Sequence, residues 1–206
     1  MPGHATDRYQ QHRAQAILAA ASVFSEKGFH GATTKDIAER LGIKQGSLYY
    51  YFSSKEEALE EVCLFGIRDY VQRMDQIAAN DQPFEAKLIA ILTSHLSSYR
   101  ERNEALKVHN DERLYLPPEK RTRLKELGTH YREKLEEIFE EGVSDGTLRK
   151  SLDCHFAAQS VIGICNAWGD IIVRDPGLDM FAVIQKCADL LLDGFRERRG
   201  AGRALD

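Results

Sequence analysis

The stretch from Thr33 to Lys55, TTKDIAERLGIKQGSLYYYFSSK, constrains the fold of this chain more than any other part of it. Asp36 follows Thr33 by three residues, a capping-box spacing that starts a helix because each side chain satisfies a backbone N–H that no intrahelical carbonyl reaches. Gly42 ends this helix, since glycine adopts a positive φ without steric cost. The stretch is therefore predicted to open with a short helix over residues 33–41 and a tight turn.

A second short helix is predicted from about Gln45 to Tyr51. Leu48 and Phe52 lie on its apolar side and are expected to be buried. The side chains expected to project outward together are those of Gln45, Ser47, Tyr49 and Tyr50. Two short helices around a glycine turn form a helix-turn-helix, whose second helix can enter a DNA major groove. Plain core hairpins use the same turn, so this pattern alone leaves both interpretations open.

The order of residues around the two helices is more specific than the turn itself. It runs Gly28-Phe29, Gly31-Ala32-Thr33-Thr34, Asp36-Ile37-Ala38, Leu41-Gly42-Ile43, Gly46-Ser47-Leu48-Tyr49, Tyr51-Phe52 and Ser54-Lys55. This order closely resembles the DNA-binding head of the tetracycline-repressor (TetR) family of bacterial regulators, over roughly the first 60 residues. The resemblance implies a ligand-responsive transcriptional repressor that binds a double-stranded DNA operator.

Helical spacing of apolar residues continues through the rest of the chain, and no strand-like alternation is present. Further helices are expected over residues 7–27, 55–79, 84–100, 104–115, 119–145, 154–174 and 179–196. The predicted fold class is therefore all-α, with about nine helices. We expect a three-helix helix-turn-helix domain over residues 1–54, an effector-binding and dimerisation domain over residues 55–200, and a disordered tail over residues 201–206.

The resemblance also implies how the head contacts DNA. Gln45 and Ser47 are expected to face base edges, where the Gln45 amide suits adenine through a bidentate pair. The residues expected at phosphates are Thr33, Lys44, Tyr49, Tyr50 and Lys55, and the predicted DNA-binding set also includes Thr34 and Gly46. Lys44 departs from the capping Ser or Thr usual in the family, which costs about 1 kcal/mol of helix stability but adds a positive charge.

Positive charge is concentrated in the first part of the chain. Residues 1–55 carry seven Lys or Arg and four Asp or Glu, whereas the whole chain has a formal net charge of −4. A basic head on an acidic body is expected where only the head docks on DNA, because phosphate neutralisation supplies much of the affinity. Ordinary surface variation produces the same difference, so charge by itself does not decide.

The last two predicted helices carry stripes that are typical of an interface between subunits. The predicted dimer contacts are Phe156, Gly163, Ile164, Ala167, Ile171, Ile184, Ala188, Leu191 and Phe195. A monomer could bury both stripes internally, but the resemblance implies that this helix pair forms a homodimer. A two-fold dimer presents two recognition helices, which requires symmetric half-sites spaced by about 34 Å of DNA or more.

The resemblance further implies an effector pocket among the helices over residues 84–173. The segments 109–114, 146–149 and 163–168 are similar to the effector domains of family members that sense acyl-coenzyme A thioesters. The predicted lining residues are Leu92, Leu96, Tyr99, Arg113, Tyr131, Arg149, Asn166 and Trp168, with the two arginines meeting coenzyme phosphates. Two alternatives stay open: these aromatic residues are simply core residues, or the effector is a non-CoA aromatic or lipophilic compound, as in regulators of efflux or stress genes.

Other classes of protein fit the sequence less well. A di-iron bundle enzyme needs two Glu-x-x-His elements and the chain has none, so neither catalysis nor a metal or other cofactor is expected. The four cysteines, scattered without a Cys-x-x-Cys pair, are expected to be reduced thiols. No apolar run is expected to reach the ~20 residues of a membrane span and no signal peptide is evident, so we expect a cytoplasmic protein without a membrane partner.

Overall fold

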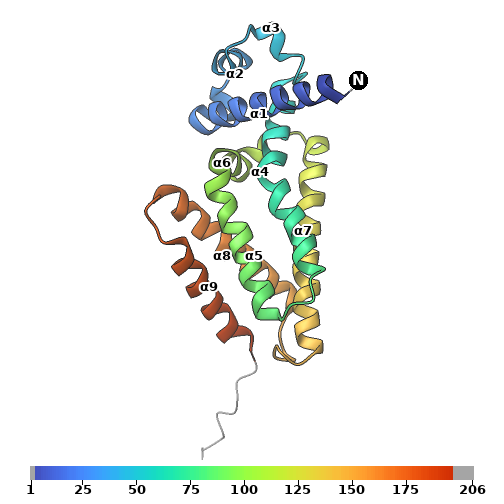
Figure 1. Cartoon of the computed structure of the whole chain (residues 1–206). Coiled ribbons are helices and arrows are strands. Elements are labelled where there is room, and N and C mark those ends of the chain that lie inside the picture. The colour runs from blue at the N-terminus through green and yellow to red at the C-terminus, as the bar shows by residue number, and fades with distance from the viewer. Residues whose placement is uncertain (1–2, 197–206) are drawn as a thin grey trace, which may run out of the picture. The chain divides into compact units, whose positions relative to one another are not determined.

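The structure, a computed structural model, describes residues 3–196 and is all-α over that range. The helices are α1 (Gly3–Gly31), α2 (Thr34–Leu41), α3 (Gln45–Leu48), α4 (Lys55–Ala78), α5 (Phe84–Glu101), α6 (Asn103–Glu112), the 3₁₀ turn η1 (Arg113–Tyr115), α7 (Pro118–Ser144), α8 (Cys154–Arg174) and α9 (Met180–Phe195) (Figure 1). The predicted fold class is confirmed. The tail predicted over residues 201–206 lies outside the described residues.

The chain divides into two compact units. We call residues 1–69 with 101–127 the head unit, and residues 70–100 with 128–206 the bundle unit. Helices α4 and α7 each contribute residues to both units. This geometric division differs from the functional division after residue 54, which remains a prediction.

In the head unit, α1 is interrupted at Gly28, where φ is +68°. The sequence predicted the end of the helix at this glycine, but helical structure resumes and continues to Gly31. The backbone N–H of Phe29, directly after the break, donates to Oε2 of Glu112 in α6 at 2.9 Å. A side chain from another helix therefore satisfies a donor at the break in α1.

Helix α2 begins and ends as predicted. The hydroxyl of Thr33 accepts from the Asp36 N–H, the Asp36 carboxylate accepts from the Thr33 N–H, and Gly42 closes the helix at φ +74°. Helix α3 is shorter than the predicted residues 45–51, because the N–H groups of Tyr50 and Tyr51 bond three residues back in a tightened turn. Leu48 and Phe52 are nevertheless buried as expected.

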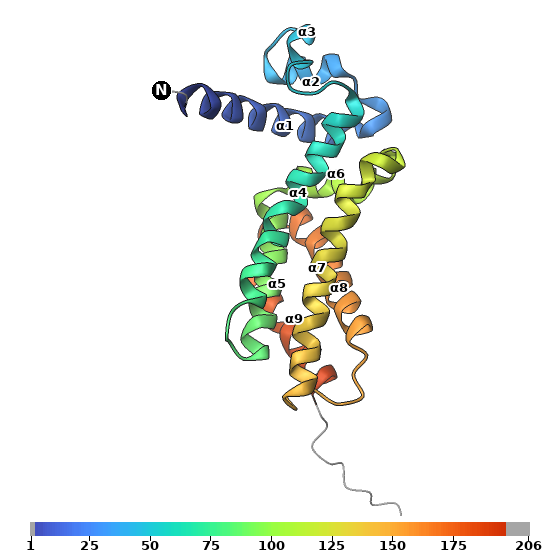
Figure 2. The same cartoon turned by 90° about the vertical axis from the view of Figure 1, so that its right-hand side faces the viewer.

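The bundle unit is built from the second part of α4 together with α5, the second part of α7, α8 and α9 (Figure 2). Its core is apolar and includes Leu92, Leu96, Leu135, Phe139, Val161 and Leu192. Polar contacts also tie the helices: Arg73 of α4 donates to Ser94 and Ser98 of α5 at 2.8 and 2.7 Å. Asp153 and Asp179 cap α8 and α9, each side chain accepting from the backbone N–H three residues further along.

One helix within the described range, α8, is long and apolar enough to cross a membrane by length and composition, with a mean hydropathy of 1.3. This corrects the expectation that no apolar run reaches such a length. The core helices of soluble proteins pass the same test, so the signal is weak. Helix α8 packs against α9, and its Asn166 accepts a hydrogen bond from Tyr99 of α5.

Candidate functional site

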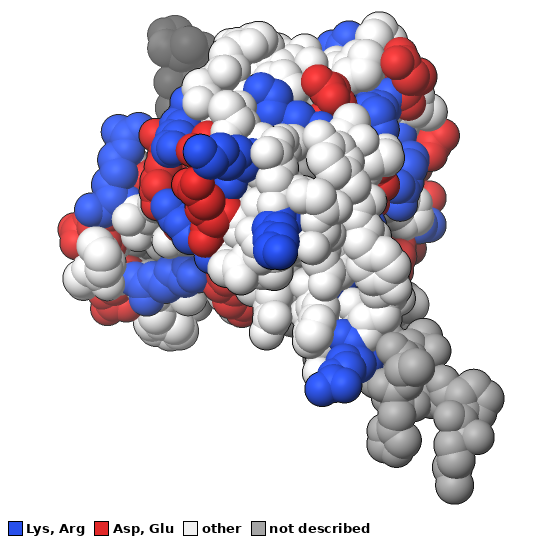
Figure 3. Space-filling view, turned by 90° about the horizontal axis from the view of Figure 1, so that it is seen from above, with Lys and Arg blue, Asp and Glu red and all other residues white. Residues whose placement is uncertain are grey.

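The second helix of the helix-turn-helix presents a compact exposed surface. Gln45, Gly46 and Ser47 are exposed, and the rings of Tyr49 and Tyr50 follow them with 55 % and 70 % of their surface accessible. Leu48 and Phe52 anchor this surface from beneath, each only 2 % exposed. Figure 3 shows the side on which α2 and α3 lie. A broad uncharged area contains several Lys and Arg side chains, and acidic side chains lie mostly toward the margins of this area.

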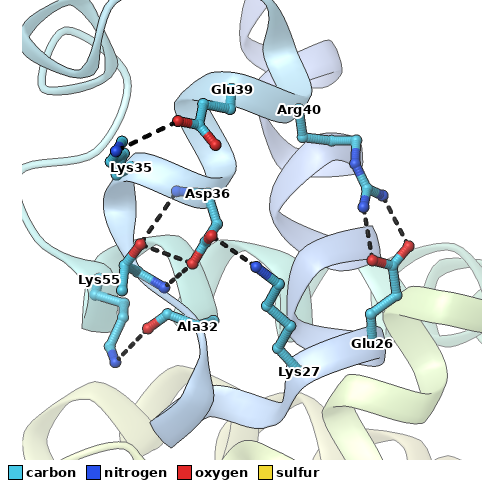
Figure 4. Close-up of polar contacts among 9 residues, drawn as sticks. Glu26, Lys27, Ala32, Lys35, Asp36, Glu39, Arg40 and Lys55 are labelled. Carbon is cyan, nitrogen blue, oxygen red and sulfur yellow. Dashed lines mark hydrogen bonds and ion pairs between the residues drawn. The ribbon is translucent and has the colours of Figure 1, made fainter.

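A network of charged groups fixes the start of α2 (Figure 4). The Lys27 ammonium donates to Asp36 Oδ1 at 2.6 Å, and the Thr33 hydroxyl donates to Asp36 Oδ2 at 2.7 Å. These hydrogen bonds, that from Lys27 foremost, lower the pKa of Asp36 to about 2. The Thr33 hydroxyl, predicted at a phosphate, is thus engaged in the capping box. Arg40 of α2 also pairs with Glu26 of α1, at 2.6 Å.

Lys55, predicted at a phosphate, has its ammonium engaged within the head unit. Its ammonium donates to the backbone carbonyls of Phe29 and Ala32 at 2.8 and 2.9 Å and lies 4.4 Å from the centre of the Phe29 ring. The cation therefore braces the junction of α1, α2 and α4, and its donors point into the head (Figure 4). Lys44, by contrast, is exposed and makes no capping hydrogen bond.

Gln45 and Thr34 are joined directly. Nε2 of Gln45 donates to Oγ1 of Thr34 at 2.9 Å, which links the first residue of α3 to the first residue of α2. Spacing along the sequence does not predict this bond, because the residues are eleven positions apart and lie on different helices.

Tyr9 of α1 contacts two tyrosines that follow α3, and sequence reasoning missed this contact. Its ring meets the Tyr50 ring edge-on at 5.3 Å and stacks on the Tyr51 ring at 6.3 Å. Aromatic pairs of this kind stabilise by about 0.5–1.5 kcal/mol beyond their buried area. Tyr9 thus supports the exposed Tyr50 from a helix some forty residues earlier, and no local pattern indicates this.

The predicted effector residues separate into a buried group and a peripheral group. The buried group in the bundle unit consists of Leu92, Leu96, Tyr99 and Tyr131. On α8, Asn166 is exposed and Trp168 is half-buried. Arg149 also belongs to the bundle unit, and its backbone N–H donates to the backbone carbonyl of Phe195 at 3.1 Å. Arg113 belongs to the head unit, where its guanidinium donates to the carbonyls of His109 and Asn110.

The buried group forms a hydrogen-bonded aromatic cluster. The hydroxyl of Tyr99 donates to Asn166 Oδ1 at 3.1 Å, and Nδ1 of His95 lies 3.1 Å from the Tyr131 hydroxyl. The Tyr70 ring stacks on His95 at 4.5 Å. Burial lowers the pKa of His95 to about 4 and raises that of Tyr131 well above its usual value. His95 was absent from the predicted lining, although a histidine on the inner face of an apolar helix is a signal that could have identified it.

The Tyr99 ring lies directly against the backbone of α8. A Cβ atom added at Gly169 would lie 2.3 Å from the Tyr99 ring, so only glycine allows this approach. The core of the bundle unit is therefore filled here by the protein's own side chains.

A hollow of about 270 Å³ opens elsewhere in the bundle unit, beside the start of α5 and the ends of α7 and α9. Apolar atoms of Phe84, Ile138 and Leu192 contribute to its wall. Four of its charged groups form two ion pairs: Lys87 with Glu141 at 3.1 Å, and Arg196 with Glu85 at 2.6 Å. None of the eight predicted effector residues borders this hollow.

The predicted dimer residues divide between the two helices. On α8, Phe156 is 71 % exposed, and Gly163, Ala167 and Ile171 are also exposed, with Ile164 half-buried. On α9, the structure corrects the selection: Ile184, Ala188, Leu191 and Phe195 are all buried within the single chain. The exposed apolar side chains of α9 are Phe181 and Leu190, at 71 % and 68 %. Helix α9 is apolar on two sides, and the sequence does not say which side faces the chain's own core.

Comparison with known proteins identifies the family. Residues 16–62 match the family described as bacterial regulatory proteins, tetR family, and residues 81–194 match the tetracyclin repressor-like C-terminal domain. The HTH-type transcriptional repressor KstR2 of Rhodococcus jostii (strain RHA1) is 30% identical over 196 residues, covering 94% of this chain and 95% of the relative.

Solved structures agree in fold. The TetR family transcriptional regulator PfmR from Thermus thermophilus superimposes with a TM-score of 0.80 at 26% identity, covering 91% of this chain and 99% of that one. The transcriptional regulator FadR from Bacillus subtilis, in complex with stearoyl-CoA, superimposes with a TM-score of 0.75 at 26% identity, covering 88% and 98%. Regulators of this family bind DNA operators as dimers and are not enzymes. The chain described here belongs to the tetR family of bacterial regulatory proteins.

Proposed function

We propose that this chain is a cytoplasmic repressor that binds a palindromic operator as a homodimer and whose DNA affinity changes when a small apolar effector binds. The observation that carries the proposal is the exposed surface of Gln45, Ser47, Tyr49 and Tyr50 on a helix-turn-helix anchored by buried residues. Exposed amide, hydroxyl and phenol groups on a short helix are suited to base edges and phosphates.

Within this site the residues take different roles. We assign base contacts to Gln45 and Ser47, and phosphate contacts to Lys44, Tyr49 and Tyr50. A Cβ atom added at Gly46 would meet no atom within 4 Å, so the helix surface is open here and the small residue lets it approach the DNA closely. We assign Lys55 and the Thr33 hydroxyl to bracing the head, because their polar atoms are engaged within it.

The dimer surface follows from the exposed apolar side chains of α8 and α9. We propose that Phe156, Gly163, Ile164, Ala167 and Ile171 of α8 meet the second protomer together with Phe181 and Leu190 of α9. Large exposed apolar side chains gathered on two neighbouring helices favour association, because water leaves their surfaces on contact.

The effector is proposed to be an acyl-coenzyme A thioester bound among Leu92, Leu96, Tyr99, Tyr131, Asn166 and Trp168. Support comes from the FadR structure with stearoyl-CoA, and from the apolar character of this region. Arg149 is the better-placed candidate for a coenzyme phosphate, because its buried Nε has no hydrogen-bond partner in the described part of the chain. The Tyr70, His95, Tyr99 and Tyr131 cluster favours a second candidate, an aromatic or lipophilic effector without coenzyme A.

Two linked measurements test the proposal. Selection of bound duplexes from a random pool is expected to return a palindrome bound by two protomers, and a panel of acyl-coenzyme A thioesters is then titrated against that complex. By linkage, an effector that weakens operator binding by some factor must itself bind more weakly to the operator complex by the same factor, typically about 5- to 150-fold. No sequence preference would refute the DNA-binding proposal, and thioesters that neither bind nor alter operator affinity would refute the effector.

A further inference from the structure

We propose that Thr34 is a positioning residue for base reading by Gln45, and that the two residues together select an adenine at one position of each operator half-site. This inference rests on the proposed function, since it concerns how the same surface reads DNA. It gives Thr34, a member of the predicted DNA-binding set, a specific role, and it makes specificity a property of α2 and α3 jointly.

The position of the Thr34 hydroxyl is fixed by the start of α2. Thr34 directly follows Thr33, which forms a reciprocal capping box with Asp36, and Asp36 is itself held by Lys27 at 2.6 Å. The Gln45 amide donates to this fixed hydroxyl over 2.9 Å. Gln45 is exposed and Thr34 is half-buried, so the bond lies on the surface that faces outward with Ser47.

The bond leaves a defined edge of the Gln45 amide available. An amide NH₂ carries two N–H donors, and only one of them is used by Thr34. No hydrogen bond described for the side chains of residues 8–196 engages the carbonyl oxygen Oε1. The side chain therefore presents one donor and one acceptor next to each other.

This pattern matches one base best. Adenine offers an acceptor at N7 and a donor at N6 in the major groove, whereas guanine offers acceptors at both N7 and O6 and thymine an acceptor at O4. Oε1 would face another oxygen on guanine or thymine. Cytosine, with only its N4 donor, would satisfy Oε1 but leave the remaining N–H unpaired.

The bond between Thr34 and Gln45 also reduces the conformational entropy that Gln45 loses when it binds a base. A free glutamine side chain loses rotamer freedom when it binds, at a cost of about two- to tenfold in affinity for one immobilised side chain. Because Thr34 already holds the Gln45 amide before DNA binds, part of this rotamer freedom is lost in the free protein and not on binding. Loss of the Thr34 hydroxyl is therefore expected to weaken the preference for adenine at the Gln45 position and to leave DNA contacts by other residues unchanged.

The experiment compares variants on duplexes altered at each base pair of the selected operator, symmetrically in both half-sites. Wild type is expected to prefer adenine at one position by about 5- to 150-fold, a preference that Gln45→Ala removes. Thr34→Val is expected to lower that preference by about two- to tenfold and to leave preferences at other positions unchanged. Thr34→Ser, which keeps the hydroxyl, is expected to retain it.

A double-variant cycle separates positioning from direct contact. In the Gln45→Ala background, Thr34→Val is expected to have no further effect on the preference at that position. Thr93→Val is the matched control, because it removes an exposed threonine hydroxyl from α5, outside the head unit.

Three results would overturn the inference: equal weakening of all duplexes by Thr34→Val, an undiminished effect of Thr34→Val in the Gln45→Ala background, or selection of guanine or thymine at the Gln45 position. Failure of the proposed function looks different, because wild type itself would then select no operator.

Discussion

The head unit and the bundle unit carry their functional residues in opposite ways. In the head unit, the proposed DNA-contacting residues are nearly consecutive, they are exposed, and buried Leu48 and Phe52 hold them from one side. In the bundle unit, the effector candidates come from α5, α7, α8 and the segment between α7 and α8, and Leu92, Leu96, Tyr99 and Tyr131 are buried. The proposed DNA-reading surface is made by one short segment on a firm support. The proposed effector region is made by distant residues, whose hydrogen bonds would have to rearrange for a ligand to enter.

Matched core truncations test this contrast most strongly. Leu48→Ala in the head unit and Leu135→Ala in the bundle unit each remove a buried leucine, and each is expected to cost about 2–5 kcal/mol of unfolding free energy. Leu48→Ala is expected to abolish operator binding, because the recognition surface loses its anchor. Denaturant unfolding and operator titration check both, and equal operator affinity for Leu48→Ala and wild type would contradict the anchoring role.

Acid is expected to weaken the bundle unit through His95. Burial lowers the pKa of His95 to about 4 in the folded chain, below its value of about 6.5 when unfolded. The unfolded state therefore takes up a proton first, and stability falls as pH drops from about 6.5 to about 4, by about 3 kcal/mol at most. Unfolding free energy measured across this range in wild type and His95→Gln provides the check.

His109 of the head unit is half-buried, and desolvation followed by the Arg113 charge also lowers its pKa to about 4, so it acts in the same direction. The His95→Gln variant is accordingly expected to reduce the acid sensitivity without removing it. An unchanged pH dependence in that variant would show that His95 is not held neutral.

The approach of Tyr99 to α8 is tested by adding one methyl group. Gly169→Ala is expected to destabilise the chain by about 1–3 kcal/mol, because the new Cβ meets a buried ring that is also hydrogen-bonded to Asn166. Gly128→Ala in α7 is the matched control, since its Cβ would meet nothing within 4 Å, and it is expected to stabilise by about 0.5–1 kcal/mol. Equal thermal midpoints for the two variants would mean that the Tyr99 ring moves aside freely.

The smallest expected effect concerns Tyr9. Tyr9→Ala removes the ring that meets Tyr50 and Tyr51, and it is expected to weaken operator binding by about 0.5–1.5 kcal/mol without changing base preference. Tyr9→Phe keeps both ring contacts and is expected to bind as wild type does. Fluorescence anisotropy with the operator duplex measures both, and a loss of affinity in Tyr9→Phe equal to that in Tyr9→Ala would point to the hydroxyl instead of the ring.

Local features predicted the head well. The Thr33–Asp36 capping box, the Gly42 turn and the burial of Leu48 and Phe52 all follow from residues within a few positions of one another. The length of α3 did not, because the N–H groups of Tyr50 and Tyr51 bond three residues back in a tightened turn that helical spacing does not predict. The carbonyl partners of Lys55 were not predicted either, since they lie more than twenty residues earlier.

The sequence by itself determined the all-α class, the capping of α2 and the helix-turn-helix motif, because helix signals act over three or four residues. Only the tertiary structure decided which apolar side of α9 faces inward, and that Tyr9 supports Tyr50 and Thr34 holds Gln45. It also decided that His95, Tyr99 and Tyr131 fill the bundle core together. These contacts join residues far apart in the chain, and their energies depend on packing that no local pattern encodes.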